Sequence, residues 1–177
     1  MDGPFYHDSR TPFLTGDIPA VTLATTLKSL TPIANVPLLG SNYFNYVGKA
    51  LRVRVFGRQS TGATPGNLTM ALLYGTGADN TGNTLVSTAG TGTANQTSVS
   101  WLVDVIVRCR TLGATGSLMC TGMWFIATQG FFCLPSTVPA AVTCDLTANN
   151  LITVQAMRSG STAESWQVHD ISFESLN

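Results

Sequence analysis

The sequence contains few charged residues and few histidines. Asp, Glu, Lys and Arg make up 10% of its 177 residues, and their formal net charge is zero, whereas about a quarter of the residues are charged in an ordinary soluble domain. This balance disfavours a nucleic-acid-binding protein, whose affinity comes from neutralising phosphates. With only His7 and His169, acid–base catalysis has few candidate groups. Surfaces with so little charge suit a protein that neighbouring molecules cover.

Long apolar runs are also missing. No run approaches the roughly 20 apolar residues that a membrane-spanning helix needs. The first ten residues, MDGPFYHDSR, have no basic start followed by an apolar core, so they do not match a secretory signal. We therefore expect no membrane partner, and a chain that is made and folded in a reducing cytoplasm.

The motifs of common enzymes and metal sites are absent as well. The patterns GxGxxG, GxxxxGK[ST] and GxSxG do not occur. The glycine-rich stretch GTGADNTGN at 75–83 has a single carboxylate, Asp79, where a calcium loop needs several. The four cysteines show no CxxC spacing, which disfavours a zinc site. We predict no enzymatic activity, no catalytic residues, no metal and no cofactor.

The clearest positive signal is the stretch SVSWLVDVIVRCR, residues 98–110. Val99, Trp101 and every second residue up to Cys109 are apolar, and the interleaved set is mixed. Successive side chains of a strand point to opposite faces, so this pattern predicts a strand with one wholly apolar face. Its 13 residues are long for a strand, which favours a place in the middle of a sheet.

Further strands are predicted from alternating apolar residues and from turn signals. The segment 146–158 could be tested as a helix, but its helical face carries two asparagines and a threonine, so a strand is preferred. The predicted strands lie within 18–30, 49–58, 67–74, 84–88, 98–110, 116–127, 146–158 and 164–174. The pair 49–58 and 67–74 is expected to form one hairpin, and the pair 98–110 and 116–127 another. The irregular stretch 129–145 is expected to cross between sheets.

The cysteines and His169 have structural interpretations. A hairpin centred on 113–116 would place Cys109 opposite Cys120, where either a disulfide or two buried free thiols could form, and free thiols are preferred. In 164–174 the apolar parity changes, which predicts a bulge near His169 and Asp170. Neighbouring strand residues point to opposite faces, so these two do not form a catalytic dyad. A hydrogen-bonded bulge histidine is expected.

Together these strands predict an all-β protein, a two-sheet antiparallel sandwich that is jelly-roll-like, with an extended N-terminal arm. An immunoglobulin-like sandwich is the alternative, but the Cys…Trp…Cys spacing is missing. The predicted division is an arm over 1–17 and one sandwich domain over 18–177.

Two groups of residues are candidates for contacts with other molecules. Phe5, Tyr6 and Phe13 lie in the arm, which is either a poorly ordered terminus or an anchor on a neighbouring subunit. Five arginines share the outward parity of two predicted strands: Arg52, Arg54, Arg58, Arg108 and Arg110. They form either a solvated sheet face or a basic strip that docks on an acidic protein surface; DNA binding is the least favoured role.

Three long segments carry a family resemblance. They are TPFLTGDIPAVTLATT at 11–26, LLGSNYFNYVGKALRVRVFG followed by STGATPGNLT at 38–69, and VQAMRSGSTAESWQVHDISFESLN at 154–177. These segments resemble a family of small structural proteins of tailed bacteriophages, especially those of actinobacterial hosts, identified as capsid decoration (cement) proteins. The similarity covers most of the chain and includes no catalytic motif.

The resemblance implies a function on the virion. A decoration protein binds the exterior of the assembled capsid, contacts the major capsid protein, stabilises the head and commonly forms a homotrimer. Two other functions remain open: a receptor- or glycan-binding jelly-roll module of a tail or head fibre, which needs a concave pocket with aromatic platforms, and a small hydrolase, which needs a serine or a carboxylate pair near His169.

Overall fold

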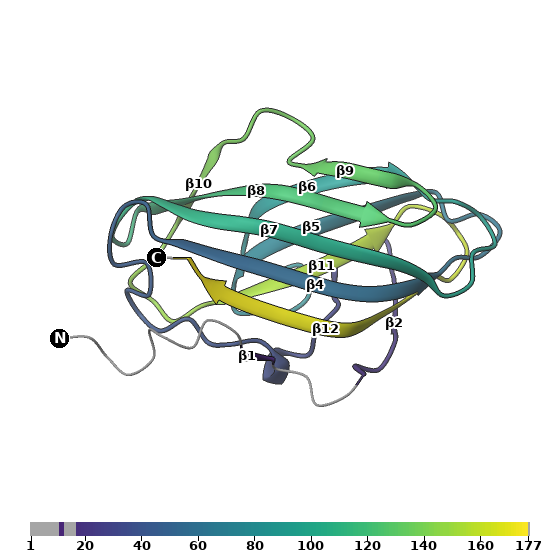
Figure 1. The fold of residues 1–177 in the computed structure, drawn as a ribbon, viewed down its shortest axis with the longest axis horizontal. Helices are drawn as coiled ribbons and strands as arrows, with labels where there is room; N and C mark the ends of the chain where they lie inside the picture. The colour runs from purple at the N-terminus through teal and green to yellow at the C-terminus, as the bar shows by residue number, and fades with distance from the viewer. Residues whose placement is uncertain (1–10, 13–16, 177) are drawn as a thin grey trace.

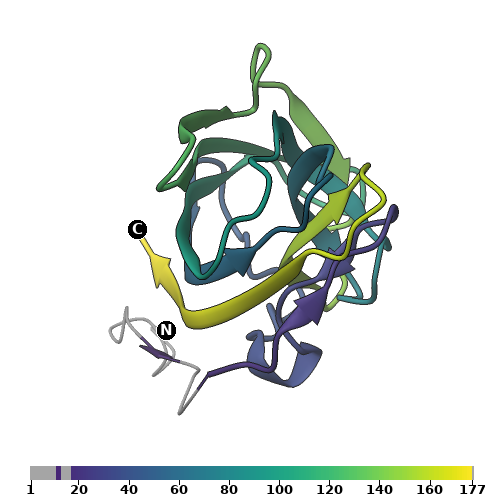
Figure 2. The ribbon, with the colours of Figure 1, turned by 90° about the vertical axis from the view of Figure 1, so that its right-hand side faces the viewer.

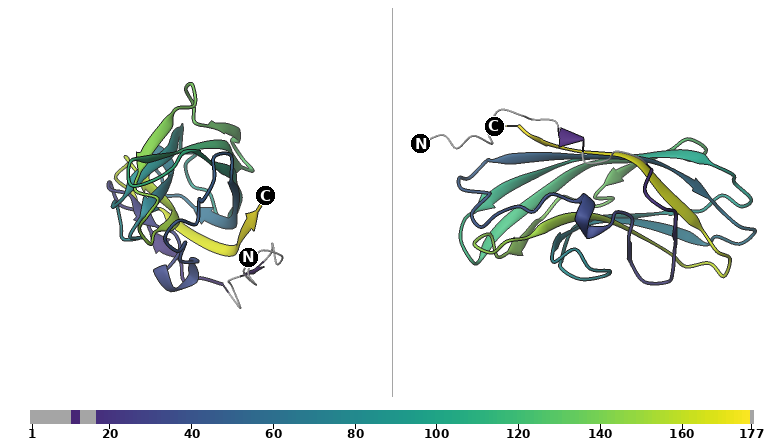
Figure 3. Two further views of the ribbon diagram at one scale, coloured as in Figure 1. Left: turned by 90° about the vertical axis from the view of Figure 1, so that its left-hand side faces the viewer. Right: turned by 90° about the horizontal axis from the view of Figure 1, so that it is seen from below.

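Two antiparallel β-sheets packed face to face form the body of the protein, as a computed structural model that describes residues 11–12 and 17–176 shows (Figure 1). An eight-stranded sheet has the order β1-β12-β4-β7-β8-β10, with β2 also paired to β12 and β9 to β8. A four-stranded sheet has the order β3-β11-β5-β6. The predicted all-β, jelly-roll-like sandwich is confirmed, and the view from below in Figure 3 separates its two layers.

The bounds of the strands follow chain order. They are β1 Thr11–Pro12, β2 Val21–Thr22, β3 Lys28–Ser29, β4 Ala50–Ser60, β5 Asn67–Gly75, β6 Asn83–Thr91, β7 Val99–Thr111, β8 Gly116–Ile126, β9 Gly130–Leu134, β10 Ala141–Cys144, β11 Leu151–Arg158 and β12 Ser165–Ser175. One short 3-10 helix, Ile33–Asn35, lies in the connection between β3 and β4.

The eight-stranded sheet is apolar on its inner face and mixed on its outer face. Strand β7 lies between β4 and β8, the central place that its length predicted. Its Val103, Val105 and Val107 are buried, while the interleaved Leu102 and Ile106 are half-buried. Strict alternation therefore separates a core face from an outward face along this strand.

The two central strands of the four-stranded sheet, β5 and β11, are buried on both faces over most of their length. Residues Leu151–Ala156 of β11 are all buried, as are Met70–Tyr74 of β5. The loop 76–82 folds back over the face that points away from the core. There Gln155 accepts a hydrogen bond from the Asn80 backbone N–H at 2.8 Å and donates one to the Ala78 carbonyl at 3.1 Å. This cover explains why burial does not alternate along β11, although apolar and polar residues do.

Aromatic rings fill one end of the space between the sheets. Ring centroids of Trp101 and Trp166 lie 5.1 Å apart, and those of Trp124 and Trp166 lie 6.0 Å apart. All three tryptophans are buried. Gly57 lies against this cluster, because a Cβ there would come within 2.7 Å of the Trp101 ring. Figure 2, an end-on view, shows how the strands curve around this interior.

Two sequence predictions about pairing are confirmed. Strands β7 and β8 form an antiparallel hairpin. In β12 the pairing with β4 shifts between Val168 and Asp170, which is the bulge predicted near His169. The bulge shifts the alternation by one residue, so the side chains of Ile171 and Phe173 point into the core, and both are buried.

Three other predictions are wrong. The single strand expected over 18–30 is two short strands, β2 on the eight-stranded sheet and β3 on the other, because this segment crosses between the layers. Strand β5 pairs with β6 and β11 instead of forming a hairpin with β4. The stretch 129–145 stays on one sheet, since β9 and β10 both pair with β8.

The cysteines are free thiols. Cys109, Cys120 and Cys144 are buried, and Cys133 is exposed. A register shift between Cys109 and Thr111 places Cys109 opposite Leu118, while Cys120 lies opposite Val107. The predicted face-to-face arrangement of Cys109 and Cys120 is therefore wrong by two residues. Burial raises the pKa of the Cys120 thiol to about 12, so it stays protonated and unreactive at neutral pH.

Candidate binding surface

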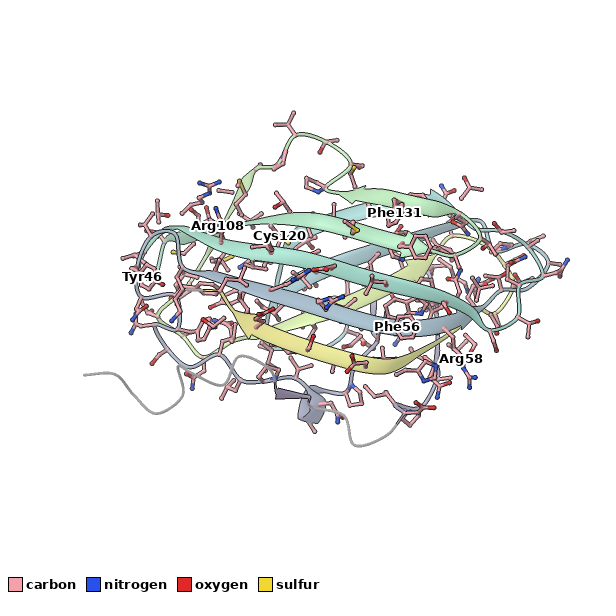
Figure 4. The ribbon with its side chains drawn as sticks, in the orientation of Figure 1. Tyr46, Phe56, Arg58, Arg108, Cys120 and Phe131 are labelled. Carbon is pink, nitrogen blue, oxygen red and sulfur yellow. The ribbon has the colours of Figure 1, made fainter. Side chains whose placement is uncertain are left out.

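A row of apolar side chains crosses the outer face of the eight-stranded sheet. Phe56 of β4 lies opposite Leu102 of β7, Leu102 opposite Phe125 of β8, and Phe125 opposite Phe131 of β9. The Phe125 and Phe131 ring centroids are 4.7 Å apart. Figure 4 labels Phe56 and Phe131, which lie on the sheet that faces the viewer.

Solvent reaches much of this row. The exposed fractions are 71% for Phe131 and 43% for Phe56, and Met123, on the neighbouring position of β8, is 42% exposed. The β8–β9 end, comprising Met123, Phe125 and Phe131, is called the docking patch below. Exposed apolar side chains that gather on one face mark a surface for contact with another molecule.

The five candidate arginines do lie on this face, because β4 and β7 are neighbours. Asp104 of β7 interrupts them. The Nε and Nη2 atoms of Arg52 donate to its two carboxylate oxygens at 2.8 and 2.6 Å, and Nε of Arg54 lies 3.3 Å from Oδ2. The hydrogen bond and the charge of Asp104 raise the pKa of Arg52. The middle of the predicted strip is thus largely neutralised.

Of the remaining arginines, Arg58 is far from Arg108 and Arg110. Arg58 donates to Gln167 at 2.9 Å near one end of the sandwich, while Arg108 lies towards the opposite end (Figure 4). Arg110 contacts the Met119 sulfur at 3.3 Å. The arginines do not form the continuous basic strip that a large acidic partner would require.

A shallow groove lies beside the bulge of β12. Its volume is about 270 Å³, and its lining residues are Arg54, Phe56, Leu102, Asp170 and Ser172. Asp170 lies opposite Phe56 in the register, and Ser172 lies opposite Arg54. Among the described residues the Asp170 carboxylate has no hydrogen-bond or ion-pair partner. An aromatic ring, a hydroxyl and an unpaired carboxylate therefore meet in one concavity.

His169, the extra residue of the bulge, has a partner. Its Nδ1 lies 2.6 Å from Oδ1 of Asp17. This is the hydrogen-bonded bulge histidine that the sequence predicted, and the contact ties the segment before β2 to the edge of the sheet. The candidates Phe5, Tyr6 and Phe13 lie outside the described residues.

A second cavity, of about 370 Å³, lies on the other side of the molecule between the segment 18–21, residues 29–32 and the loop 76–82. Its walls are mainly apolar. The Asp79 carboxylate at its rim is already used, because Lys28 Nζ donates to one oxygen and the Ser29 backbone N–H to the other, both at 2.8 Å. This cavity therefore offers a ligand little polar recognition.

Two further findings hold for residues 11–12 and 17–176. No group of three or more His, Cys, Asp or Glu side chains is arranged to hold a metal ion. No helix in this part of the chain has the length and apolar character of a membrane span.

Sequence reasoning missed most of this surface. The sequence predicts Phe125 on a hairpin strand and Phe131 in an irregular stretch. It assigns Asp170 only to a bulge. A signal for the two phenylalanines was present, since Phe125 has the outward parity of its strand and Phe131 follows closely on the three-residue turn at 127–129. The strand register decides which residues lie side by side on neighbouring strands, and the alternation of apolar and polar residues does not define that register.

Comparison with known proteins gives no family. No protein-family model matches the sequence, and no curated protein matches it. Among solved structures, the legume lectin-like domain from Entamoeba histolytica is 7% identical, with 90% of this chain and 91% of that chain covered and a TM-score of 0.35.

Two botulinum neurotoxin structures also match. One is of botulinum neurotoxin type C, whose cell entry depends on two ganglioside molecules; it is 9% identical over 96% of this chain, with a TM-score of 0.34. The other is the binding domain of serotype C1, 9% identical over 91% of this chain, with a TM-score of 0.26. This chain spans about half the length of these toxin chains, at 49% and 45%. Since all three likenesses are this distant, the function is argued from the geometry of this chain.

Proposed function

We propose that this protein is a non-catalytic structural component of a tailed-phage virion that docks on the exterior of the capsid. The resemblance of three long sequence segments to decoration proteins motivates this assignment. The proposed partners are the major capsid protein and further copies of this chain, as a homotrimer. No nucleic acid or membrane takes part.

The observation that carries this proposal is the open outer face of the eight-stranded sheet. The docking patch presents Met123, Phe125 and Phe131 on two adjacent strands, and each side chain is held by a regular ladder. A rigid apolar surface loses little conformational entropy when a partner covers it. A decoration protein that binds only the assembled shell stabilises that shell by mass action, and several copies held together strengthen each other's attachment.

The test uses heads of the phage that encodes the chain, stripped of this protein. Purified wild-type protein should sediment with the heads and raise their resistance to heat. Phe131→Ser should weaken this binding at least tenfold, because it removes the most exposed ring of the docking patch. Leu38→Ser is the matched control, since Leu38 is also highly exposed but lies in the connection before β4. Equal binding by wild type and Phe131→Ser would exclude this surface.

The arm is tested separately. Deletion of residues 1–17 should abolish head binding or trimer formation while the far-ultraviolet circular dichroism of the sandwich stays the same. Unchanged head binding and an unchanged mass in light scattering would remove Phe5, Tyr6 and Phe13 from the proposal.

A saccharide-binding module of a tail or head fibre is the second candidate function. The groove beside the β12 bulge favours it, because the groove combines an aromatic wall with polar side chains that have capacity for further hydrogen bonds. Binding of the purified protein to a glycan array tests this function independently of capsid heads.

A further inference from the structure

We propose that the groove beside the β12 bulge binds one uncharged pyranose ring, stacked on Phe56 and held by hydrogen bonds to Asp170 and Ser172. This inference deepens the second candidate function and does not depend on capsid docking. It rests on the shape of the groove, on the unpaired carboxylate and on the charges around it.

The aromatic wall supplies the first part of the site. Phe56 is 43% exposed, and its neighbours across the strands are Leu102 on one side and Asp170 on the other. Aromatic faces carry partial negative charge, and the C–H bonds on one face of a pyranose carry partial positive charge, so the two surfaces attract and exclude water. The β4–β7 ladder fixes the ring without help from a mobile loop.

The bulge supplies the polar part. In a regular strand Asp170 would share the parity of Val168, two residues before it, and would point towards the core; the bulge takes His169 out of the ladder, so Asp170 pairs with Phe56 on the outer face. The contact between His169 and Asp17 occupies the other side chain of the bulge. Asp170 is left exposed beside the ring, where a carboxylate accepts hydrogen bonds from two neighbouring hydroxyls. Bulges commonly re-aim a side chain in this way at functional sites.

The charges indicate an uncharged ligand. The groove has one positive group, Arg54, and one negative group, Asp170, which balance each other. Arg52, on the same strand, is fully engaged in its two-point contact with Asp104. An acidic sugar would gain the attraction of Arg54, but it would face the repulsion of Asp170 and Asp104. A strongly cationic ligand would gain the attraction of Asp170 but would face the repulsion of Arg54.

Arg54 has N–H donors available for hydrogen bonds to the ligand. Its contact with Asp104, at 3.3 Å, is a single one to a carboxylate that Arg52 already holds at 2.6 Å, and its side chain is half exposed. A guanidinium has five N–H donors, so Arg54 keeps donors for a ring oxygen or a hydroxyl. Ser172, opposite Arg54, supplies a hydroxyl that both donates and accepts.

The experiment uses the full chain on an array of neutral and acidic oligosaccharides, followed by calorimetric titration of the best neutral glycan. The expected result is binding to at least one class of neutral glycan. Phe56→Ala and Asp170→Asn should each weaken it at least tenfold. The controls are Phe131→Ala, an exposed ring on β9 outside the groove, and Glu174→Gln, a carboxylate on β12 outside it. Both controls should retain wild-type affinity, and thermal unfolding should show that all four variants fold.

The outcomes separate the hypotheses. No binding to any glycan would overturn both this inference and the second candidate function. Binding to acidic glycans alone, or binding that Phe56→Ala leaves unchanged, would overturn the assigned site and ligand but keep a saccharide function. The Asp170→Asn variant should still bind capsid heads. Loss of saccharide binding at the groove is therefore distinguishable from loss of capsid binding at the docking patch.

Discussion

The two sheets differ in how much of their central strands is covered. In the four-stranded sheet, neighbouring residues of β5 and β11 are buried together, because the core lies on one side and the loop 76–82 on the other. In the eight-stranded sheet, burial alternates along β4 and β7, and the outer face is open. The covered strands therefore contribute stability through both faces, whereas the outer face of the eight-stranded sheet stays accessible to solvent.

Alanine substitutions at adjacent positions give the largest expected contrast. Leu72→Ala and Leu73→Ala on β5 should each lower the free energy of unfolding by about 2–5 kcal/mol, because both side chains are buried. On β8, Trp124→Ala should cost about 3–5 kcal/mol, while its neighbour Met123→Ala should change stability by less than about 0.5 kcal/mol. Urea unfolding measures all four. Equal costs for Met123 and Trp124 would show that the outer face is also covered.

One buried amide helps to hold the loop 76–82 over β11. Gln155 is fully buried and bonds to Ala78, Asn80 and Thr153. Gln155→Ala should destabilise the protein by about 1–3 kcal/mol, since it removes the hydrogen bonds by which this buried side chain holds the loop. The loop should also become the first site of proteolysis. Wild-type resistance of this variant to protease would mean that other contacts hold the loop.

The same loop should respond weakly to pH. The hydrogen bonds from Lys28 and from the Ser29 backbone hold the pKa of Asp79 below its usual value. A lowered pKa in the folded state contributes stability above the unfolded value of about 3.9, and this contribution is lost as the pH falls through the folded value. Both side chains are over a third exposed, so we expect an effect of at most about 1 kcal/mol.

Hydrogen exchange of the loop amides between pH 6 and pH 3 measures this response, once corrected for the intrinsic pH dependence. Protection should fall at the acid end in the wild type, and Asp79→Asn should be weakly protected throughout. A wild-type profile that stays flat would show that the loop is held by Gln155 alone.

Removal of the most exposed ring should have the smallest effect on stability. Phe131→Ser should leave the unfolding free energy within about 0.5 kcal/mol of the wild type, because the side chain is exposed. It should lower the binding of a hydrophobic dye and raise solubility. A larger loss of stability would place the ring of Phe131 in the fold rather than in a contact surface.

The main strands of both sheets were predictable from the sequence, but the cover over β5 and β11 and the pairing between them were not. Alternation in 98–110 and 49–58 predicted strands whose apolar face lies in the core, and a change of parity predicted the bulge. Strand β11 does not alternate in burial, since both of its faces are covered. Pairing of β5 with β11 joins residues about 80 positions apart, and no local pattern encodes such a contact.

The candidate site was predicted in part. The outward parity of Arg52 and Arg54 was correct, but Asp104 neutralises them through a cross-strand register that sequence does not define. The groove depends on the same register, because it places Phe56 beside Asp170.

The connection between β9 and β10 has a practical use. Both strands share one edge of β8, and the residues 135–140 that join them stand away from the sandwich in Figure 1, with the Val138 side chain 87% exposed. A short epitope inserted after Thr137 would leave the ladders on either side intact. Antibody labelling of such a tagged protein on intact particles would then test the proposed location on the capsid exterior.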